Sequence, residues 1–527
     1  MKLTKKLITT GLAAVSVLGV ASCGGSGSSE LSIFLYQEDV VYSADMPVFK
    51  NANAYAGLEL EGLLQKYDSN FDSIYTLRGK NANIVVNDQD TIEATALKEG
   101  IFVDLTALIE AHAPNLKAYF DANPTQKAWA TASDGKIYGI PFYTDGQTAK
   151  AFFVRQDWVK LLKDNGKLPA GIDADNLDNM TVSQYEELLM EFKKNEKLML
   201  QGYPATTIYP YFDRDSDFAI SELAGLWGAT GDLYNDNGTV KHGAIQPEFR
   251  EAMKNMVRWY KNGLIEPEIL VSSTTDKRVT YFSSNQGGST HDWIGTTYSF
   301  NDDVYAANLA PDFDLTCILP PVQGLDENGN EIRYEATVRK QIGKVTAINK
   351  NTSEEDQIKA IKWIDYFFSE KGHKELNYGI EGEHFNMENG VVKYTSKIVN
   401  SNSTALASLY KIGAQLQSAG VQTFEYEKAW LSDEANAAMT AYEPYLNKTY
   451  NDLIYPNVKY TNEEYQKVNE AKNMVAQVYL EQVNSWLTGK IDINNDAEWN
   501  KYLTKMEQAG VQTIVQHTQA AYDRKAK

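Results

Sequence analysis

The chain has 527 residues and a formal net charge of −20 at pH 7, and 43% of its residues are hydrophobic. A chain of this length is too long for a single hydrophobic core, so two or more lobes are expected. The acidic balance disfavours binding to nucleic acid or to an anionic lipid surface, because both carry charge of the same sign.

The first 22 residues have the pattern of a secretory signal peptide. Three lysines come first, and the apolar run LITTGLAAVSVLGV follows them. This run is shorter than the roughly 20 apolar residues of a membrane-spanning helix, and an uncleaved N-terminal anchor is the alternative. The letters VASC, residues 20–23, resemble the bacterial lipobox, in which the cysteine is acylated and becomes the new N-terminus. We therefore expect a lipoprotein signal peptide over residues 1–22 and lipidation of Cys23.

A glycine- and serine-rich stretch follows, and residues 23–30 are expected to be a flexible tether. Stable anchoring takes about two lipid signals, which an acylated cysteine with more than one chain supplies. Without the signal peptide the net charge becomes −23, because three lysines and no acids are removed. The other cysteine, Cys317, lies in the apolar run FDLTCILPP and is expected to be a buried core thiol without a disulfide partner.

Strand and helix patterns alternate along the first third of the chain. Apolar runs at 32–36 and 81–86 predict buried strands, and 58–64 predicts a strand or a short helix. Helices are expected over residues 46–57, 70–80, 90–100 and 102–114. This alternation indicates βαβ units and a largely parallel sheet.

Turn and capping signals organise the rest of the chain. In chain order, the expected elements are a turn and strand over 134–146, a strand and helix over 150–162, a helix over 181–195 capped by Thr181 or Ser183, an Asn-Gly hairpin at 235–240, a helix from Pro247 to Gly263, a second hairpin at 326–334 and a helix over 353–372. From residue 400 onward the pattern is mostly helical.

No catalytic constellation stands out, so we expect no enzyme, no cofactor and no catalytic metal. HExxH and G-x-S-x-G are missing, and the six histidines are scattered along the sequence. Acidic stretches at 173–175 and 492–496 lack the glycine and glutamate of an EF-hand, although a structural calcium ion is an open alternative. Asp496 is expected to begin a helix instead. With 70 acidic residues, chance pairs suited to glycoside hydrolysis also occur, and nothing selects one pair.

The aromatic content favours binding of a sugar, since the chain has 9 Trp and 32 Tyr. A sugar ring stacks its apolar faces on aromatic planes, and its hydroxyls need carboxylate, amide or guanidinium partners. Ligand sites in open α/β sheets lie beyond the carboxyl ends of the strands. Six residues that follow predicted strands are therefore candidates: Gln37, Glu38, Asn87, Asp88, Tyr143 and Asp145. An ordinary solvated loop is the alternative for each of them.

Five sequence blocks occur in an order that matches a known family. They are FVDLTALIEAHAPNLKAYFDANP with ASDGKIYGIPF, then VRQDWVKLL, GAIQPEFREAMKNMVRWYKNGLIEPEIL, IDYFFSEKGHKELNYGIEGEHF and EWNKYLTKMEQAGVQTIVQHTQAAYDRKAK. Together they resemble the extracellular solute-binding protein family 1, the sugar-binding lipoproteins of ABC transporters. The stretch QEDVVYSADMP departs from the family pattern, which leaves the first ligand loop open.

The resemblance implies an α/β, two-lobed periplasmic-binding-protein-like fold (type II), with a hinge between the lobes and a helical C-terminal region. It implies that residues 31–145 and 322–398 form lobe 1, and that residues 146–321 and 399–527 form lobe 2. It also implies a monomeric, non-enzymatic receptor that closes on its ligand and docks on a membrane permease.

The resemblance adds ligand-binding candidates. In the family, the helix ending in Gly-Leu-Ile precedes a strand and an aromatic loop, so VTYFSS (279–284) would be the strand, with Asp292 and Trp293 in the loop. Trp430 resembles the position of another cleft aromatic, and a packed core tryptophan is the alternative for both. The remaining candidates are Arg214 and Asp217, in a loop that could equally be solvated, together with Arg339 and Glu381.

We therefore expect a receptor that is lipid-anchored on the outer face of the cytoplasmic membrane and carries an oligosaccharide to an ABC importer. No contact with nucleic acid is expected, and none with the membrane except through the lipid. The alternatives are the same fold binding a peptide or another polar solute, a glycan-cleaving lipoprotein, and an all-helical surface glycan-binding lipoprotein. The early strands LSIFLYQ and NANIVV argue against the all-helical alternative.

Overall fold

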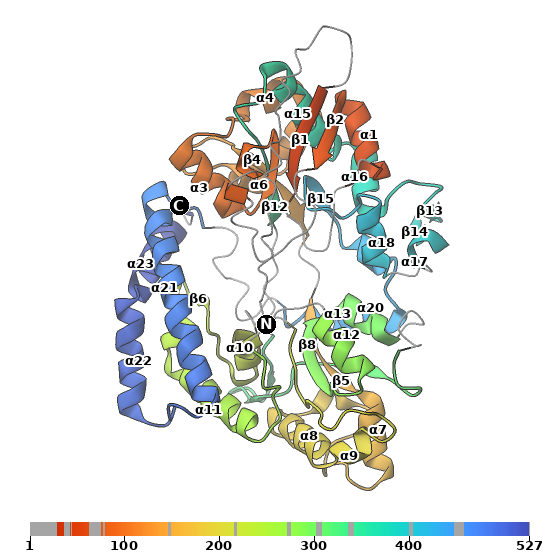
Figure 1. Ribbon diagram of the computed structural model, residues 1–527, viewed down its shortest axis with the longest axis vertical. Helices are drawn as coiled ribbons and strands as arrows, with labels where there is room; N and C mark the ends of the chain where they lie inside the picture. The colour runs from red at the N-terminus through yellow and green to blue at the C-terminus, as the bar shows by residue number, and fades with distance from the viewer. Residues whose placement is uncertain are drawn as a thin grey trace, which may run out of the picture.

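The chain folds into two lobes, which Figure 1 shows one above the other. The computed structural model describes residues 29–35, 43, 45–62, 75–76, 79–145, 149–214, 219–270, 276–301, 308–335, 342–399, 404–446 and 458–525. The signal peptide and nearly all of the tether lie outside these residues, as does most of the helix expected over 70–80. The described residues change from one lobe to the other at three points along the chain, which we call crossings: between 145 and 149, between 335 and 342, and after 422.

A six-stranded mixed sheet forms the centre of lobe 1. Its order is β15-β4-β12-β3-β1-β2. The strands are β1 (Ser29–Leu35), β2 (Leu58–Gly62), β3 (Ile84–Asn87), β4 (Gly139–Thr144), β12 (Ile342–Ile348) and β15 (Gly420–Gln422). β1 runs parallel to β2 and β3, as the sequence predicts, whereas β12 returns antiparallel between β3 and β4.

Both faces of this sheet are buried. Ile33 and Leu35 of β1 face one apolar core, and Phe34 between them faces another. A strand buried on both faces needs apolar residues at every position, which explains the continuous apolar run. The surrounding elements are α1 (Pro47–Ala56), α3 (Gln89–Glu99), α4 (Thr106–His112), α5 (Pro114–Ala122), α6 (Pro124–Ala130), α15 (Glu354–Tyr366), α16 (Glu370–Tyr378), α17 (Ser396–Val399), α18 (Ala405–Lys411) and the hairpin β13–β14 (Phe385–Glu388, Val391–Tyr394).

Lobe 2 is built on a smaller, antiparallel sheet in the order β8-β5-β9. Its strands are β5 (Lys150–Arg155), β8 (Ser289–Trp293) and β9 (Leu315–Ile318). The surrounding helices are α7 (Gln156–Asp164), α8 (Val182–Lys194), α9 (Glu196–Met199), α10 (Ala219–Ala224), α11 (Pro247–Lys261), α12 (Asp276–Ser283), α13 (Ile294–Tyr298) and α20 (Asp433–Tyr442). Two short hairpins, β6–β7 (Leu233–Asp236, Thr239–His242) and β10–β11 (Gly324–Leu325, Glu331–Ile332), complete the lobe.

Three C-terminal helices extend lobe 2, and this confirms the predicted helical end of the chain. They are α21 (Asn462–Leu487), α22 (Asp496–Gln508) and α23 (Val511–Lys525). Their apolar faces join the main core of lobe 2, where Trp486 stacks on Trp499 with ring centroids 5.7 Å apart. In Figure 1 these helices rise along one side of the molecule towards α3 of lobe 1.

Local signals placed several elements correctly. Thr181 and Gln184 form a capping box at the start of α8, and Pro247 is the first residue of α11. The predicted Asn-Gly turn between β6 and β7 has positive φ at Asn237 and Gly238, which this tight hairpin requires. Asp496 begins α22, as expected.

The prediction of a strand at VTYFSS was wrong, because these residues belong mostly to α12. The β-branched and aromatic letters favour a strand only in isolation. In the folded chain, Tyr281 donates a hydrogen bond to Glu266, and Phe282 packs edge-on against Phe212 and Phe300. Tertiary packing therefore overrides the local preference. The strand lies further along, at Ser289–Trp293, and contains Asp292 and Trp293 itself.

The lobe boundaries differ from those that the sequence suggested. The Val322 amide donates a hydrogen bond to the Met180 carbonyl, and Arg333 donates to the carbonyls of Asp178 and Pro320. Residues 322–335 therefore lie in lobe 2. Residues 404–422 pack with lobe 1, where β15 pairs with β4. The second crossing therefore follows residue 335, and the third follows β15 rather than residue 398.

None of the described helices is long and apolar enough to cross a membrane.

An ion pair also joins the lobes where α21 approaches α3. Lys459, just before α21, pairs with Glu93 of α3, and Gln89 donates to the same carboxylate at 2.6 Å. The Lys459 carbonyl accepts a hydrogen bond from Arg524 of α23 at 2.9 Å, which ties this segment to lobe 2. Both partners are only partly exposed, so solvent screens the pair less than a surface pair.

Breaking this pair should loosen the arrangement of the lobes. An ion pair of this exposure contributes about 1 kcal/mol or less, which shifts the equilibrium between lobe arrangements about fivefold. We expect the ligand-free Glu93→Gln and Lys459→Met variants to have a larger radius of gyration by small-angle X-ray scattering. Lys467→Met is the control, because Lys467 lies on α21 itself and pairs with exposed Glu463. An unchanged radius of gyration in both variants would show that the pair of Lys459 and Glu93 does not hold the lobes together.

Candidate functional site

The ends of the three crossings converge where the two lobes meet. The first crossing runs from Asp145, just after β4, to Lys150 at the start of β5. The second begins after Glu335, and the third runs from β15 through α19 (Glu425–Lys428) to α20. β8 of lobe 2 ends beside them at Trp293, which is paired with Lys150. This junction is our candidate ligand site.

Four buried ionisable side chains lie under one face of β8. His291 Nδ1 is 2.8 Å from Glu222 of α10, and its Nε2 is 3.0 Å from Glu335. The Lys150 ammonium donates to the other oxygen of Glu222. All four side chains are less than 10% exposed. We call His291, Glu222, Lys150 and Glu335 the buried ion cluster.

The residues of the buried ion cluster stabilise one another in their charged forms. Burial alone would lower the pKa of His291, but the Glu335 and Glu222 carboxylates raise it to about 10. Burial opposes ionisation of Lys150 and Glu222 as well, yet Glu222 and Asp213 raise the Lys150 pKa, and Lys150 and His291 lower the Glu222 pKa. At neutral pH the histidine is therefore a cation held between two carboxylates.

A second set of charges lies on the opposite face of β8. Asp292 Oδ2 accepts hydrogen bonds from Arg214 at 2.7 Å and from Arg278 of α12 at 3.0 Å. Arg278 also donates to Thr297 of α13 at 2.6 Å. Burial tends to raise the pKa of Asp292, but the two guanidinium groups hold it far below its usual value. Asp292 thus fixes both arginines beside the end of the strand.

Trp293 ends β8 at the junction, and its side chain is only partly buried. Directly opposite it in the sheet, the Lys150 ammonium lies 5.6 Å from the centroid of the indole ring. A cation at this distance over an aromatic face is attracted to it. The cluster therefore fixes the orientation of an indole ring that keeps some exposed surface.

Successive residues of the third crossing pack on different lobes. Tyr426 and Trp430 pack on the core of lobe 1, whereas Phe424 and Leu431 pack on a core of lobe 2. The Phe424 amide donates to Asp145 at 2.7 Å, which links the third crossing to the first. Trp430, partly buried, is therefore a second aromatic at the junction.

The structure brings five of the predicted ligand residues to this junction: Asp145, Arg214, Asp292, Trp293 and Trp430. Asn87 and Asp88 lie at the carboxyl end of β3, at the same edge of the sheet where β4 ends, and Asp88 pairs with Lys344 at 2.8 Å. Tyr143 is buried in lobe 1 and donates to the Gln126 carbonyl at 2.8 Å. Glu381 is exposed in the turn before β13. The others fall outside the described residues: Cys23, Gln37, Glu38, Asp217 and Arg339.

Sequence reasoning missed the buried partners at the junction. Lys150, Glu222, Arg278, Glu335 and Glu427 were not candidates, and His291, which lies in the same segment as the candidates Asp292 and Trp293, was not assigned a ligand role. A usable signal was present in KAFFVR, where a charged residue stands at each end of an apolar run, and in STHDW, where two ionisable residues stand together. Charged residues are almost never fully buried unless they are paired, so such positions call for partners.

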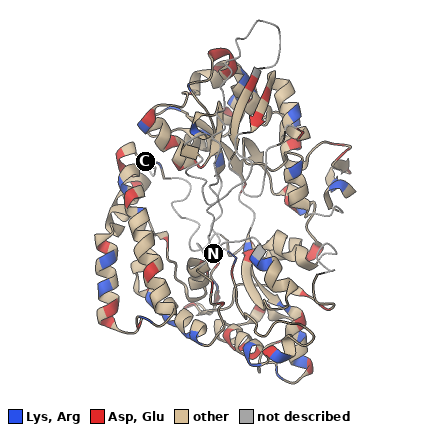
Figure 2. Cartoon of the chain, viewed as in Figure 1, with Lys and Arg blue, Asp and Glu red and all other residues tan. Residues whose placement is uncertain are grey.

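The surface charges contrast with these buried ones. Figure 2 shows acidic and basic residues interspersed over both lobes. Many of their pairs are exposed, such as Lys467–Glu463, and exposed pairs contribute little to stability.

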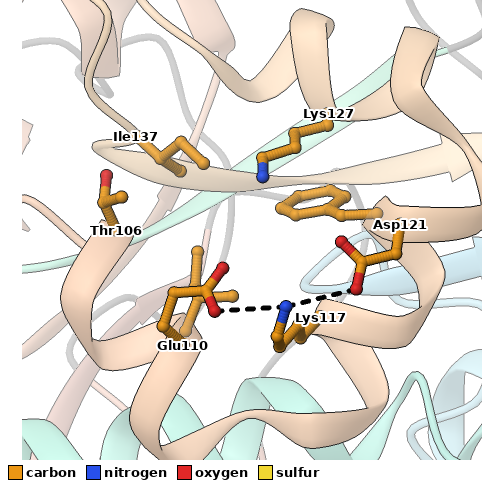
Figure 3. Close-up of a pocket in the computed structure, with 8 residues that line it drawn as sticks. Thr106, Glu110, Lys117, Asp121, Lys127 and Ile137 are labelled. Carbon is orange, nitrogen blue, oxygen red and sulfur yellow. Dashed lines mark hydrogen bonds and ion pairs between the residues drawn. The ribbon is translucent and has the colours of Figure 1, made fainter.

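Two other features carry no sign of a ligand. In the acidic stretch at 173–175, Asp173 accepts the amide of Asp175, which itself pairs with Lys163 at 2.9 Å. Among the described residues, no three His, Cys, Asp or Glu side chains are grouped to hold a metal ion. A small pocket lies on lobe 1 alone, between α4, α5 and α6, where Lys117 bridges Glu110 and Asp121 (Figure 3).

Comparisons with known proteins agree on one family. The family model described as "Bacterial extracellular solute-binding protein" matches residues 38–374. Among curated proteins, the fructooligosaccharide ABC transporter substrate-binding protein FusA of Streptococcus pneumoniae serotype 4 is 23% identical over 455 residues. That match covers 81% of this chain and 76% of the relative.

Solved structures with the same fold cover nearly the whole chain. The alginate-binding protein AlgQ2, without calcium ion, matches with a TM-score of 0.77 and 27% identity, over 95% of this chain and 99% of that one. FusA of S. pneumoniae in complex with kestose matches with a TM-score of 0.70 and 17% identity. This match covers 94% of this chain and 99% of that one. These likenesses confirm the expected two-lobed α/β fold.

Removing the central histidine should destabilise the protein. His291→Gln removes the cation next to the buried Glu335 and leaves Glu222 with Lys150 alone, and breaking a buried pair costs about 3–5 kcal/mol. The stabilisation from a group whose folded pKa is raised is complete below the unfolded pKa of 6.5 and is lost as pH rises through about 10. In urea unfolding between pH 6 and 10, the free energy of unfolding of the wild-type chain should therefore fall as the pH rises. The fall should be smaller in His291→Gln.

His112→Gln, at the end of α4, is the control for this measurement, and should match the wild-type chain throughout. An equally steep decline in His291→Gln would show that the histidine does not carry this pH dependence.

Proposed function

The chain belongs to the bacterial extracellular solute-binding proteins, and we propose that it captures an oligosaccharide between its lobes and delivers it to the permease of an ABC importer. One observation carries the sugar assignment: Trp293 and Trp430, both partly exposed, lie with carboxylate and guanidinium groups at the junction of the lobes. Stacking surfaces beside polar groups suit a sugar ring. The relative FusA, a fructooligosaccharide transporter component by name, supports this class of cargo.

The junction residues divide into different roles in this proposal. Trp293 and Trp430 stack on sugar faces, and Arg214 and Asp145 take hydroxyls. Asp292 is almost fully buried and acts by holding Arg214 in place. The other proposed ligand contacts are Gln37, Glu38, Asn87, Asp88, Tyr143, Asp217, Arg339 and Glu381. Tyr143 is the weakest, because its hydroxyl is already bonded within lobe 1.

Attachment to the membrane completes the proposal. An acylated Cys23 and the following tether would keep a hinged, monomeric receptor close to its permease, on the outer face of the cytoplasmic membrane. The lipobox-like VASC supports this placement.

Isothermal titration calorimetry against plant, host and microbial oligosaccharides tests the cargo. We expect binding of at least one oligosaccharide with a negative heat-capacity change, since stacking buries apolar surface. A peptide panel under the same conditions tests the rival cargo. If no sugar binds and a peptide does, the assignment of an oligosaccharide cargo is wrong and a peptide cargo replaces it. Product analysis of any bound sugar tests for cleavage, and we expect the sugar to stay intact.

Trp293→Ala should weaken sugar binding about tenfold or more, because an aromatic contact contributes about 0.5–1.5 kcal/mol beyond the area that it buries. Trp129→Ala, a partly buried tryptophan on α6 of lobe 1, is the matched control and should keep the wild-type affinity. Equal affinities of the two variants would remove Trp293 from the site.

Labelling of cells with a radioactive fatty acid tests the anchor. The wild-type chain should incorporate label, and Cys23→Ala should not, because it removes the acylated thiol. Cys317→Ala is the control and should be labelled normally, since this thiol lies on β9. Retained label in Cys23→Ala would refute the lipobox assignment.

A further inference from the structure

Two buried polar atoms on the third crossing have no hydrogen-bond partner among the described residues. They are Oε2 of Glu427 and Nε1 of Trp430. The Glu427 side chain lies on α19 and is 7% exposed, and Trp430 follows it by three residues. Residues three apart on a helical turn lie on the same side. One acceptor and one donor are therefore left unpaired three residues apart, on the same side of this turn.

These two side chains lie against the end of β8, where the candidate site is. Gly295 follows Trp293 by two residues, and a Cβ at Gly295 would overlap Oε1 of Glu427 and lie 3.0 Å from the Trp430 ring. The absence of a side chain at Gly295 thus makes room for both. Because the third crossing packs on both lobes, the pair sits between them.

An unpaired buried polar group costs about 1–3 kcal/mol, so a folded chain keeps one mainly where something else pairs with it. A carboxyl oxygen and an indole N–H on the same side of one segment match hydroxyls, each of which can donate and accept. We propose that Glu427 and Trp430 each bind a hydroxyl of an uncharged sugar at the hinge side of the site. This inference rests on the proposed function and names two of its polar contacts.

The surroundings of Glu427 also select the charge of the ligand. Burial first, and then the nearby Asp145 carboxylate, raise the pKa of Glu427 to about 8. On its own element, Tyr426 and the exposed Glu425 and Lys428 are the other titratable groups, and Asp145 of the first crossing is the charged group that acts on Glu427 from another element. At pH 7 the Glu427 carboxyl is therefore protonated and can both donate and accept. A uronate carboxylate at this position would meet Asp145 and be repelled.

Calorimetry with an oligosaccharide that the wild-type chain binds tests this inference. Glu427→Leu removes both hydrogen-bonding functions at similar size and should weaken binding about tenfold. Glu425→Gln, two residues away on the same helix and paired with Lys428 at 2.9 Å, is the matched control and should bind like the wild type. Glu427→Gln should weaken binding less than Glu427→Leu, because its amide both donates and accepts.

The pH profile separates ligand contact from a purely structural role. As pH rises through about 8, wild-type Glu427 loses its proton and its donor, so the affinity should fall. Glu427→Gln cannot ionise, and this fall should be missing from its profile.

The inference is wrong if Glu427→Leu binds the oligosaccharide as tightly as the wild type. It is also wrong if the affinity of Glu427→Gln falls with rising pH as the wild-type affinity does. Either result leaves the proposed function standing. If the wild-type chain binds no oligosaccharide at all, the proposed function fails and the inference falls with it. Circular dichroism of each variant shows whether it is folded. Should Glu427→Leu not fold, the Glu427→Gln profile decides alone.

Discussion

The pairing of His291 with two buried carboxylates fixes the part of the molecule where the lobes meet. Lys150 begins β5 directly after the first crossing, and Glu335 is the last described residue before the second. A buried charge that leaves its partner is strongly destabilising, so these residues must stay together. The ends of both crossings are thereby held against β8.

Such a cluster is not explained by stability alone. Well-packed apolar side chains of similar volume are often as stable as a buried ion pair, because desolvation opposes the electrostatic gain. The cluster does something that an apolar core would not do: it places the Lys150 ammonium over the Trp293 ring. On the opposite face of β8, Asp292 holds Arg214 in the same way. The charges thus orient the side chains that we propose to meet the ligand.

The sequence predicts what depends on neighbouring residues and misses what depends on distant ones. The capping box at Thr181 and the hairpin at Asn237 involve residues a few positions apart, and both were predictable. The partners of His291, by contrast, lie 69 and 44 residues away, and no spacing rule connects them. Among the candidate residues, the tryptophans were found by resemblance, and their supporting charges were not. The failed strand at VTYFSS has the same cause, since contacts with distant residues decide its conformation.

The third crossing links ligand capture to lobe movement. Tyr426 and Trp430 are held by lobe 1, and Phe424 and Leu431 by lobe 2, so any rotation of the lobes must twist this short segment. Glu427 lies in its middle, buried against Gly295 of lobe 2. A rotation that moves Gly295 away would open Glu427 to water and satisfy its carboxyl with solvent. In the function that we propose, closure removes that water and a bound sugar hydroxyl supplies the missing partner, which favours the closed arrangement only when ligand is present.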